Sequence, residues 1–496
     1  MKNIFKLLTI AVLVGFVATS CADYLDVNDP ENRPTNEQVT PDLILPAAMS
    51  RTNSIQTGTM NRLGNVFMNN WSANVNSFTG GFNEEYQLII TSTFYNTIWD
   101  QLYLRSANYQ GIIDSPFTDY EYHKAIAKIM KSFYMQYIVD LYGDAPYSQA
   151  FQGGLNPAPA YDSDSAIYVA LIEEIDQAIT MINNPTLSTI PVGAEDIVYG
   201  GSMADWLKFA NTLKLRILMR QATLAESNGE AATYLNEQFA RLDTDFITES
   251  ATLNPGFAQD AGRQNPFYGT YGFDVDGNRT TTNRFVVCSL YAQEFLDGTL
   301  TGVYDARIDQ IYTPIGGAVV GVDQGIDSND PAIPDDISPL GPGLLVSDSQ
   351  DAYIMLAAES YFLQSEAAHR GYISGNAKAL FEAGILASFA HYGLDGSGYI
   401  AASAIVPEIG WDATSDKIEA IMTQKWIATN GINAIESWIE MTRTGFPEVP
   451  LAQTAQQPNK PNRLLYPSSE YIGNGANVPN QTSQDAFSTR IFWDNN

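Results

Sequence analysis

Two segments of the sequence combine aromatic rings with amide and guanidinium groups. One runs from Trp71 to Tyr86 and is rich in glycine, asparagine and serine. The other runs from Asn265 to Arg284 and ends in two arginines. Aromatic faces stack on the apolar patches of sugar rings, while amides and guanidinium groups bond to hydroxyls or acidic substituents. We therefore expect one ligand site between the segments, with these candidates: Trp71, Phe82, Asn83, Tyr86, Tyr268, Tyr271, Arg279 and Arg284.

The aromatic candidates also fit a purely structural role. Exposed rings on loops would form a binding platform, whereas buried rings would pin the loops to the core. The sequence leaves both interpretations open, and the exposure of the rings decides between them.

Carboxylates are the most abundant potential catalytic groups, with 56 aspartates and glutamates in the chain. A glycosidase pair therefore stays open as an alternative, because its test is a separation in space of about 5–5.5 Å for retaining chemistry. Other catalytic patterns are missing: the sequence has no GxSxG elbow, no GxxxxGK phosphate loop and no HExxH pair. We expect no catalytic residue, cofactor or resident metal.

Two acidic stretches have residue types that could bind calcium. Asp274 to Asn278 begins like a calcium loop, but its glycine comes early and Phe285 stands where the closing glutamate belongs, so a tight turn is expected. A different calcium site in the acidic loop from Asp323 to Asp336 remains open.

Composition limits the possible partners. The chain has 496 residues, is 45% hydrophobic and carries a formal net charge of -30. Such a chain can bury a large core, and it is repelled by phosphate backbones and anionic lipid headgroups. We therefore expect no nucleic-acid partner and no membrane attachment through a basic patch.

The N-terminus predicts export and a lipid anchor. Residues 1–20 start with Lys2 and Lys6 and continue with an uncharged apolar run, which is shorter than the roughly 20 residues of a membrane span. Small residues then lead into Cys21, which resembles a bacterial lipoprotein signal. An ordinary signal peptide followed by an incidental cysteine is the alternative. We expect Cys21 to carry lipid, residues 21–40 to form a tether and residues 41–496 to form the folded domain. The other cysteine, Cys288, is expected to be a small buried hydrophobe.

The elements that must position the candidate site are mainly helical. Apolar residues recur at offsets of three, four and seven, which marks one buried helix face in each segment. Asp119 is expected to cap the first helix and Gly143 to end it, and Ser202 with Asp205 forms a capping pattern. The predicted helices span 119–141, 163–182, 202–220, 350–369, 377–392 and 416–429.

Two regions are predicted to be irregular. Pro314–Gly343 contains six glycines, five prolines and five aspartates, which is typical of a functional or disordered loop. Pro447–Asn496 is expected to be a coiled tail packed against the body.

Several segments resemble the SusD/RagB family of nutrient-binding outer-membrane lipoproteins of Bacteroidetes. Residues 199–216 are similar to its W-x-K-F-A-N-S-L-K-x-R helix, with Thr212 in place of serine. Residues 358–371 resemble its E-x-x-F-x-x-A-E-A-x-x-R-G pattern, departing at Ser365. Shorter matches are Tyr142–Tyr147, Arg443–Pro447, Arg463–Pro467 followed by Glu470, and Ile491–Asp494.

The resemblance implies a mostly α SusD-like fold, with tetratricopeptide-like helix pairs and an irregular, ligand-facing part. It implies a surface lipoprotein of the outer membrane that binds a glycan or oligosaccharide and delivers it to a SusC-type TonB-dependent transporter. Peptide capture is the alternative within the family, whose ligand residues vary with the ligand. On the 358–371 helix, Glu359, Glu366 and Arg370 are expected to form an internal ion-pair network.

Overall fold

The computed structural model describes residues 39–495. The predicted signal, Cys21 and nearly all of the predicted tether lie outside these residues. Helices dominate the described chain, as the sequence predicts. The N-terminal half holds α2 (Pro41–Ile55), η1 (Gln56–Met60), α3 (Asn61–Phe67), α4 (Asn83–Gln87), α5 (Thr97–Ile113), α6 (Glu121–Tyr142), η2 (Gly153–Leu155), α7 (Asp164–Asn183), α8 (Met203–Arg220), α9 (Ala222–Ser227) and α10 (Gly229–Phe239).

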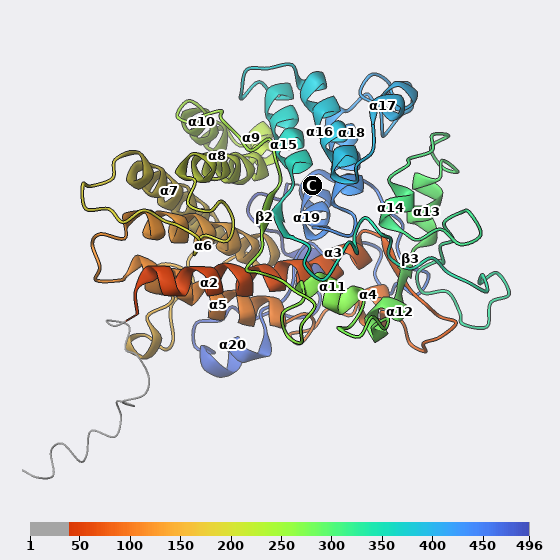
Figure 1. Ribbon diagram of the computed structural model, residues 1–496, viewed down its shortest axis with the longest axis horizontal. Helices are drawn as coiled ribbons and strands as arrows, with labels where there is room; N and C mark the ends of the chain where they lie inside the picture. The colour runs from red at the N-terminus through yellow and green to blue at the C-terminus, as the bar shows by residue number, and fades with distance from the viewer. Residues whose placement is uncertain (1–38, 496) are drawn as a thin grey trace, which may run out of the picture.

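Most helices of the C-terminal half are short, and a few are longer. They are α11 (Pro266–Tyr271), α12 (Thr281–Phe285), α13 (Leu290–Leu296), α14 (Ile308–Ile311), α15 (Ala357–His369), α16 (Ala377–His391), α17 (Ser397–Ser403), α18 (Lys417–Thr429), α19 (Ile435–Thr444), α20 (Ser468–Gly473) and α21 (Asp485–Ser488). Figure 1 shows the long helices α2, α5, α6, α7 and α8 at one end, with α4, α12 and β3 at the other.

Side-chain caps explain where several predicted helices begin. The Ser163 side chain accepts a hydrogen bond from the amide of Ala166 at the start of α7, and Asp416 caps α18 in the same manner. Ser202 caps α8 through the amide of Asp205. The expected cap at Asp119 is wrong, because α6 begins after Tyr120 without a side-chain cap.

The prediction of a single helix over 350–369 is also wrong in its first part. Residues 352–355 form strand β4, and the helix begins only at Ala357. The strand pairs with a partner about 100 residues earlier in the chain, a contact that local periodicity does not contain.

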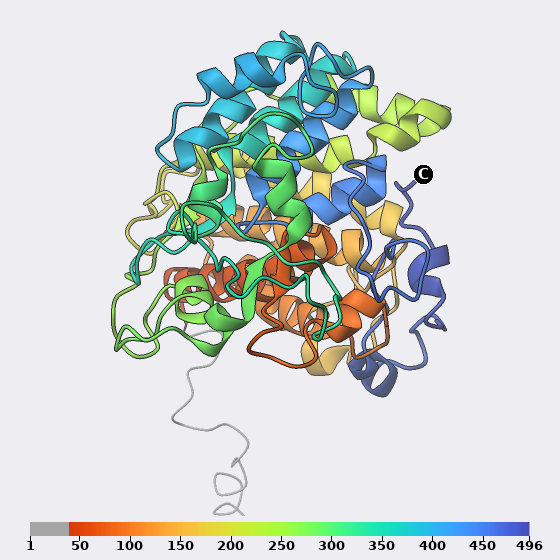
Figure 2. The same cartoon turned by 90° about the vertical axis from the view of Figure 1, so that its right-hand side faces the viewer.

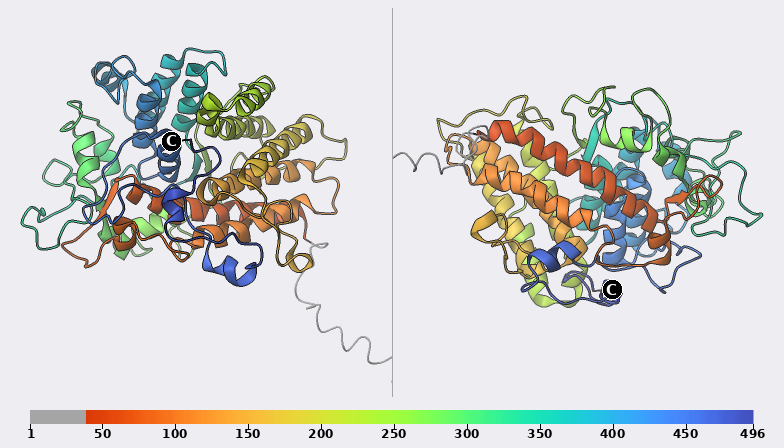
Figure 3. Two further views of the ribbon diagram at one scale, coloured as in Figure 1. Left: turned by 180° about the vertical axis from the view of Figure 1, so that it is seen from behind. Right: turned by 90° about the horizontal axis from the view of Figure 1, so that it is seen from below.

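Helices that follow one another in the sequence pack against each other in pairs, as the resemblance implies. The pairs α5–α6, α6–α7 and α15–α16 make the most extensive such contacts, and α2 lies along α5. The view from below in Figure 3 shows α2 and its neighbours side by side as one helical layer. The longer helices therefore form a continuous scaffold.

Four short strands join distant parts of the chain into two antiparallel ladders. Strand β1 (Trp71–Ala73) pairs with β3 (Val286–Cys288), with Trp71 opposite Cys288. Strand β2 (Ala251–Leu253) pairs with β4 (Ala352–Met355). The first ladder joins the two predicted ligand segments.

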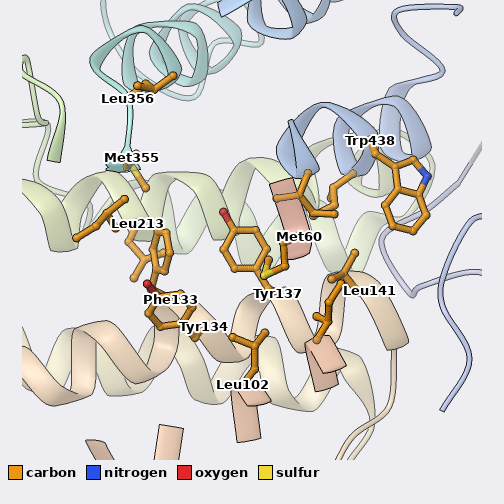
Figure 4. Close-up of a cluster of buried hydrophobic side chains, with 14 of the residues drawn as sticks. Met60, Leu102, Phe133, Tyr134, Tyr137, Leu141, Leu213, Met355, Leu356 and Trp438 are labelled. Carbon is orange, nitrogen blue, oxygen red and sulfur yellow. The ribbon is translucent and has the colours of Figure 1, made fainter. Parts of the chain in front are cut away.

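One hydrophobic core joins the two halves of the chain. Figure 4 shows Phe133 and Tyr137 of α6 between Leu102 of α5 and Leu213 of α8, with Trp438 of α19 nearby. All five side chains are almost completely buried. Cys288 is buried too, as predicted.

An ion-pair network crosses this core and confirms the prediction for α15. Glu366 contacts Arg370 at 2.8 Å and Arg443 at 2.7 Å, while Glu359 lies 3.4 Å from Arg216. We call the following residues the buried network: Asp140, Arg216, Arg220, Glu359, Glu366, Arg370, Lys425, Glu436, Glu440 and Arg443. These carboxylates are held in ion pairs inside the protein and are at most 2% exposed.

The two regions predicted to be irregular contain little regular structure. Residues 314–343 are made of turns and isolated bridges, and the tail holds only α20 and α21. Figure 2 shows the tail lying along one side of the body, and its Leu464, Tyr466 and Trp493 are buried. Between residues 39 and 495, no helix has the length and apolar character needed to cross a membrane.

Candidate functional site

The β1–β3 ladder brings the two aromatic segments together. Beyond the ladder, the amide of Asn74 donates to the carbonyl of Phe285 at 2.8 Å, and its side-chain amide donates to the carbonyl of Arg284 at 3.2 Å. The sequence predicted that these segments share a site, and the structure places them in direct contact. It also decides which of their side chains reach the surface.

Trp71 and Tyr271 are core residues. Their side chains are 0% and 2% exposed, and their ring centroids lie 5.1 Å apart. Burial raises the pKa of Tyr271 to about 12. The expectation that these rings stack on a ligand is therefore corrected, because each ring is covered by protein.

Phe82 and Tyr86 are also packed inside the segment. Phe82 is 1% exposed, and its ring packs edge-on against Tyr86 and Phe285. The Arg62 guanidinium lies 5.1 Å from the centre of the Phe82 ring. The Tyr86 hydroxyl accepts from the amide of Ala73 at 3.0 Å, and burial raises its pKa. Neither ring offers a free face, which corrects their prediction as stacking residues.

A hollow of about 480 Å³ lies beside this aromatic group. It is formed by the loop after β1, the irregular loop after Pro314 and the C-terminal tail. We call it the Phe78 hollow, and its lining residues are Val75, Phe78, Gly80, Gly81, Asn83, Tyr86, Gly325, Ile326, Asp327, Ser328, Gln453 and Thr454. Asn83 and the edge of Tyr86 are the predicted candidates that reach it.

Phe78 is the aromatic residue best placed to meet a ligand there. Its ring is half-buried and packs edge-on against Phe285 at 5.3 Å between centroids. The exposed Asn83 starts α4 on the same side of the hollow. The pair offers an aromatic ring and an amide, which is the combination that the sequence predicted with other residues.

Backbone geometry shapes the wall of the Phe78 hollow that is formed by the loop after β1. Gly81 has a φ of +51°, and a Cβ atom at this position would lie 3.3 Å from the Tyr86 ring. Glycine therefore lets the loop lie directly against the tyrosine.

The opposite wall of the hollow is formed by the loop after Pro314 and by the tail, which the sequence did not connect to the site. The Gln453 amide donates to the Asp323 carboxylate at 2.7 Å, and the Gln453 backbone amide donates to the carbonyl of Gln324 at 2.9 Å. The glycine- and aspartate-rich composition of this loop indicated a functional or a disordered segment, but no local signal pointed to Gln453 or Thr454.

The other candidates lie outside the Phe78 hollow. Tyr268 is half-buried against Phe273, with ring centroids 5.9 Å apart. Arg279 and Arg284 are exposed, and the Arg279 guanidinium is held by the side-chain and backbone oxygens of Asn283. Partial burial of its guanidinium and the nearby positive charge of Arg284 lower the pKa of Arg279. Their role in ligand binding stays a prediction.

Metal binding finds no support in the described residues. No group of three or more histidine, cysteine, aspartate or glutamate side chains in residues 39–495 is arranged to hold a metal ion. The segment after Asp274 is a tight turn, as predicted, in which the carboxylate of Asp274 accepts from the amides of Asp276 and Asn278 at 3.0 and 2.8 Å.

Comparison with known proteins places the chain by sequence and by fold. Residues 31–467 match the SusD-like family whose description is starch-binding, associating with outer membrane. No curated protein sequence matches the chain.

Solved structures with the same fold come from several Bacteroidetes. A chitin-binding SusD homologue from Flavobacterium johnsoniae has a TM-score of 0.72 at 24% identity, covering 91% of this chain and 98% of the homologue. A SusD-like protein from Bacteroides thetaiotaomicron has a TM-score of 0.72 at 22% identity, covering 92% and 98%. A SusD homologue from Parabacteroides distasonis has a TM-score of 0.72 at 21% identity, covering 93% and 98%.

The family match spans most of the sequence, and the helix pairs with their loop-rich end agree with the fold of these homologues. This chain belongs to the SusD-like family.

Proposed function

We propose that this protein captures a glycan in the Phe78 hollow at the cell surface and passes it to a SusC-type TonB-dependent transporter. The observation that carries the proposal is the hollow itself, where an aromatic ring meets amide and hydroxyl groups from three separate segments. A sugar presents apolar C–H faces and hydroxyls together, so this lining complements it.

Family membership supports the class of ligand. The family description names starch binding, and the homologue from Flavobacterium johnsoniae is described as chitin-binding. Maltooligosaccharides and chitooligosaccharides are therefore the first ligands to test, and short peptides test the alternative of peptide capture.

Binding without turnover is part of the proposal. The buried network holds its carboxylates in ion pairs, which leaves them without access to a substrate. Incubation with each oligosaccharide followed by chromatography should return the ligand intact. Shortened products would instead support the glycosidase alternative.

The binding experiment uses calorimetric titration of the oligosaccharides into the purified protein. Phe78→Ala and Asn83→Ala should weaken binding, because each removes one lining group from the hollow. Asn236→Ala is the matched control for Asn83→Ala, since Asn236 is an exposed asparagine on α10, at the helical end of the molecule in Figure 1. Equal affinity in all three variants would contradict the assignment of the hollow.

Anchoring and delivery are proposed from the sequence. Cys21 follows an uncharged run and small residues, so lipidation there would hold the protein on the outer membrane. Cys21→Ala should move the protein from the membrane fraction to the soluble fraction. Affinity purification of the tagged protein from native membranes should recover a TonB-dependent barrel, and recovery without any barrel would contradict the delivery step.

A further inference from the structure

A second hollow, of about 720 Å³, lies where α13, α18 and the loops after α17 and α19 meet. We call it the Glu419 hollow. It shares no lining residue with the Phe78 hollow, and three glutamates line it: Glu408 after α17, Glu419 on α18 and Glu448 after α19. Its volume lies in the range that is usual for sites of small organic ligands.

The negative charge of the Glu419 hollow has no counter-charge within the protein. No lysine, arginine or histidine lines the hollow, and none of its three glutamates forms an ion pair with a residue between 39 and 495. Partial burial, together with nearby negative charges led by that of Glu408, raises the pKa of Glu419. The carboxylates therefore repel one another, and a positive charge among them would be attracted by all three.

One wall of the Glu419 hollow is aromatic and is fixed by the core. Phe295 is 5% exposed and packs edge-on against Trp426, with 5.0 Å between the ring centroids. The half-buried Tyr291 lies beside both rings, and its hydroxyl donates to the carbonyl of Glu448 at 3.2 Å. The half-buried Phe446 adds a third lining ring. Aromatic faces attract ammonium groups and also pack against the C–H faces of sugars.

Thr423 of α18 adds an unused hydroxyl to the hollow. It lines the Glu419 hollow and is 1% exposed, but its hydroxyl makes no hydrogen bond within the part of the chain that the structure describes. Another buried threonine of the same helix, Thr429, donates to the carbonyl of Lys425 at 2.9 Å. A buried hydroxyl without a partner is costly, so a ligand that bonds to Thr423 removes this cost.

We propose that the Glu419 hollow binds sugars that carry a protonated primary amine, such as units of glucosamine. The ammonium group meets the carboxylates, one C–H face of the ring packs against the aromatic wall, and a ring hydroxyl bonds to Thr423. A neutral or N-acetylated sugar lacks the positive charge, and a simple diamine lacks the hydroxyl. The inference does not rest on glycan capture in the Phe78 hollow, because different residues line the two hollows.

The test is a calorimetric titration of the full folded protein with the trimer of glucosamine and, as its uncharged match, the trimer of N-acetylglucosamine. At about pH 6 the amines are protonated and ordinary carboxylates are ionised. Glu419→Gln should weaken binding of the glucosamine trimer roughly tenfold and leave binding of the N-acetylglucosamine trimer unchanged. Its melting temperature should not fall, because the substitution removes repulsion between carboxylates.

Two variants separate the site from other effects. The net charge of -30 attracts any cation, and Glu294→Gln makes the same change of charge on α13 outside the lining, so it should leave both affinities unchanged. Thr423→Val should weaken binding of the glucosamine trimer about threefold and leave that of the diamine cadaverine unchanged.

Four results would overturn the proposal. They are no binding of the glucosamine trimer, an affinity for it that Glu419→Gln does not change, equal losses in Glu419→Gln and Glu294→Gln, and cadaverine binding as tightly as the glucosamine trimer. None of them bears on the Phe78 hollow, whose binding of neutral oligosaccharides is tested by Phe78→Ala and Asn83→Ala.

Discussion

The ring of Phe78 packs edge-on against the ring of Phe285, with 5.3 Å between their centroids. The two residues are about 200 positions apart in the sequence, and the β1–β3 ladder beside them fixes their distance. Phe285 in turn packs edge-on against the buried ring of Phe82. Phe78 is therefore held by the core on one side while it lines the Phe78 hollow on the other.

Trp71→Ala should destabilise the fold. The ring is fully buried against Tyr271, so its removal leaves a large cavity and should lower the free energy of unfolding by about 3–5 kcal/mol. Urea unfolding followed by circular dichroism measures the change. Tyr304→Ala is the control, because Tyr304 is 53% exposed and should change the stability far less. Equal effects of the two substitutions would contradict the burial of Trp71.

Arg443→Met should be costly for a different reason. Arg443 donates two hydrogen bonds to Glu366, at 2.9 and 2.7 Å, and one to Glu440 at 2.7 Å. Removing the arginine breaks buried ion pairs, although Glu366 keeps its contact with Arg370 and Glu440 keeps Arg220 and Lys425. Breaking a buried pair typically costs about 3–5 kcal/mol. The exposed pair Arg263–Asp260 offers the contrast, since Arg263→Met should change the free energy of unfolding by less than about 1 kcal/mol.

The buried network should also make the stability depend on pH. Burial opposes ionisation of Glu436, but Arg220, Arg216 and Lys425 outweigh it and lower the pKa to about 2. A glutamate in the unfolded chain has a pKa of about 4.3. The contribution of Glu436 to the free energy of unfolding is therefore complete above that pH and is lost as the pH falls toward 2.

The pKa of Glu440 is also lowered. Burial raises the pKa of Glu359, which offsets part of this dependence of stability on pH. Urea unfolding at pH 7, 5, 4 and 3 should show a falling free energy of unfolding below pH 5. Glu436→Gln should flatten that decline. An unchanged pH profile of stability in this variant would contradict the role of ionised Glu436 in stability.

Gly64→Ala should disrupt the contact between α3 and α19. A Cβ atom on Gly64 would lie 2.2 Å from the backbone of Ala434 and Ile435, so the two helices would have to separate. We expect a loss of stability of more than about 1 kcal/mol, as for other overpacked cores. Gly111→Ala is the matched control inside α5, where nothing lies within 4 Å and alanine should stabilise by about 0.5–1 kcal/mol. A lower melting temperature for Gly111→Ala than for Gly64→Ala would contradict the packing.

Periodicity predicted the long helices α6, α7 and α8, because each hides one apolar face and two of them begin at capping residues such as Ser163. It predicted neither α2 nor α5. It missed β4, whose strand character depends on pairing with β2. The sequence also placed the two aromatic segments together. It could not tell Trp71 from Phe78, because burial of a ring depends on the ladder and on packing against Phe285. Gln453 reaches the Phe78 hollow only through the tertiary course of the tail.

The most direct test of the central claim is to measure ligand affinity and melting temperature together for Phe78→Ala and Tyr271→Ala. The half-buried Phe78 lines the hollow, while Tyr271 is 2% exposed and belongs to the core. Phe78→Ala should weaken oligosaccharide binding by about tenfold, as expected for the loss of roughly 1–1.5 kcal/mol of aromatic contact, with a nearly unchanged melting temperature. Tyr271→Ala should lower the melting temperature instead. Unchanged affinity in a folded Phe78→Ala protein that still binds the glycan would contradict the account.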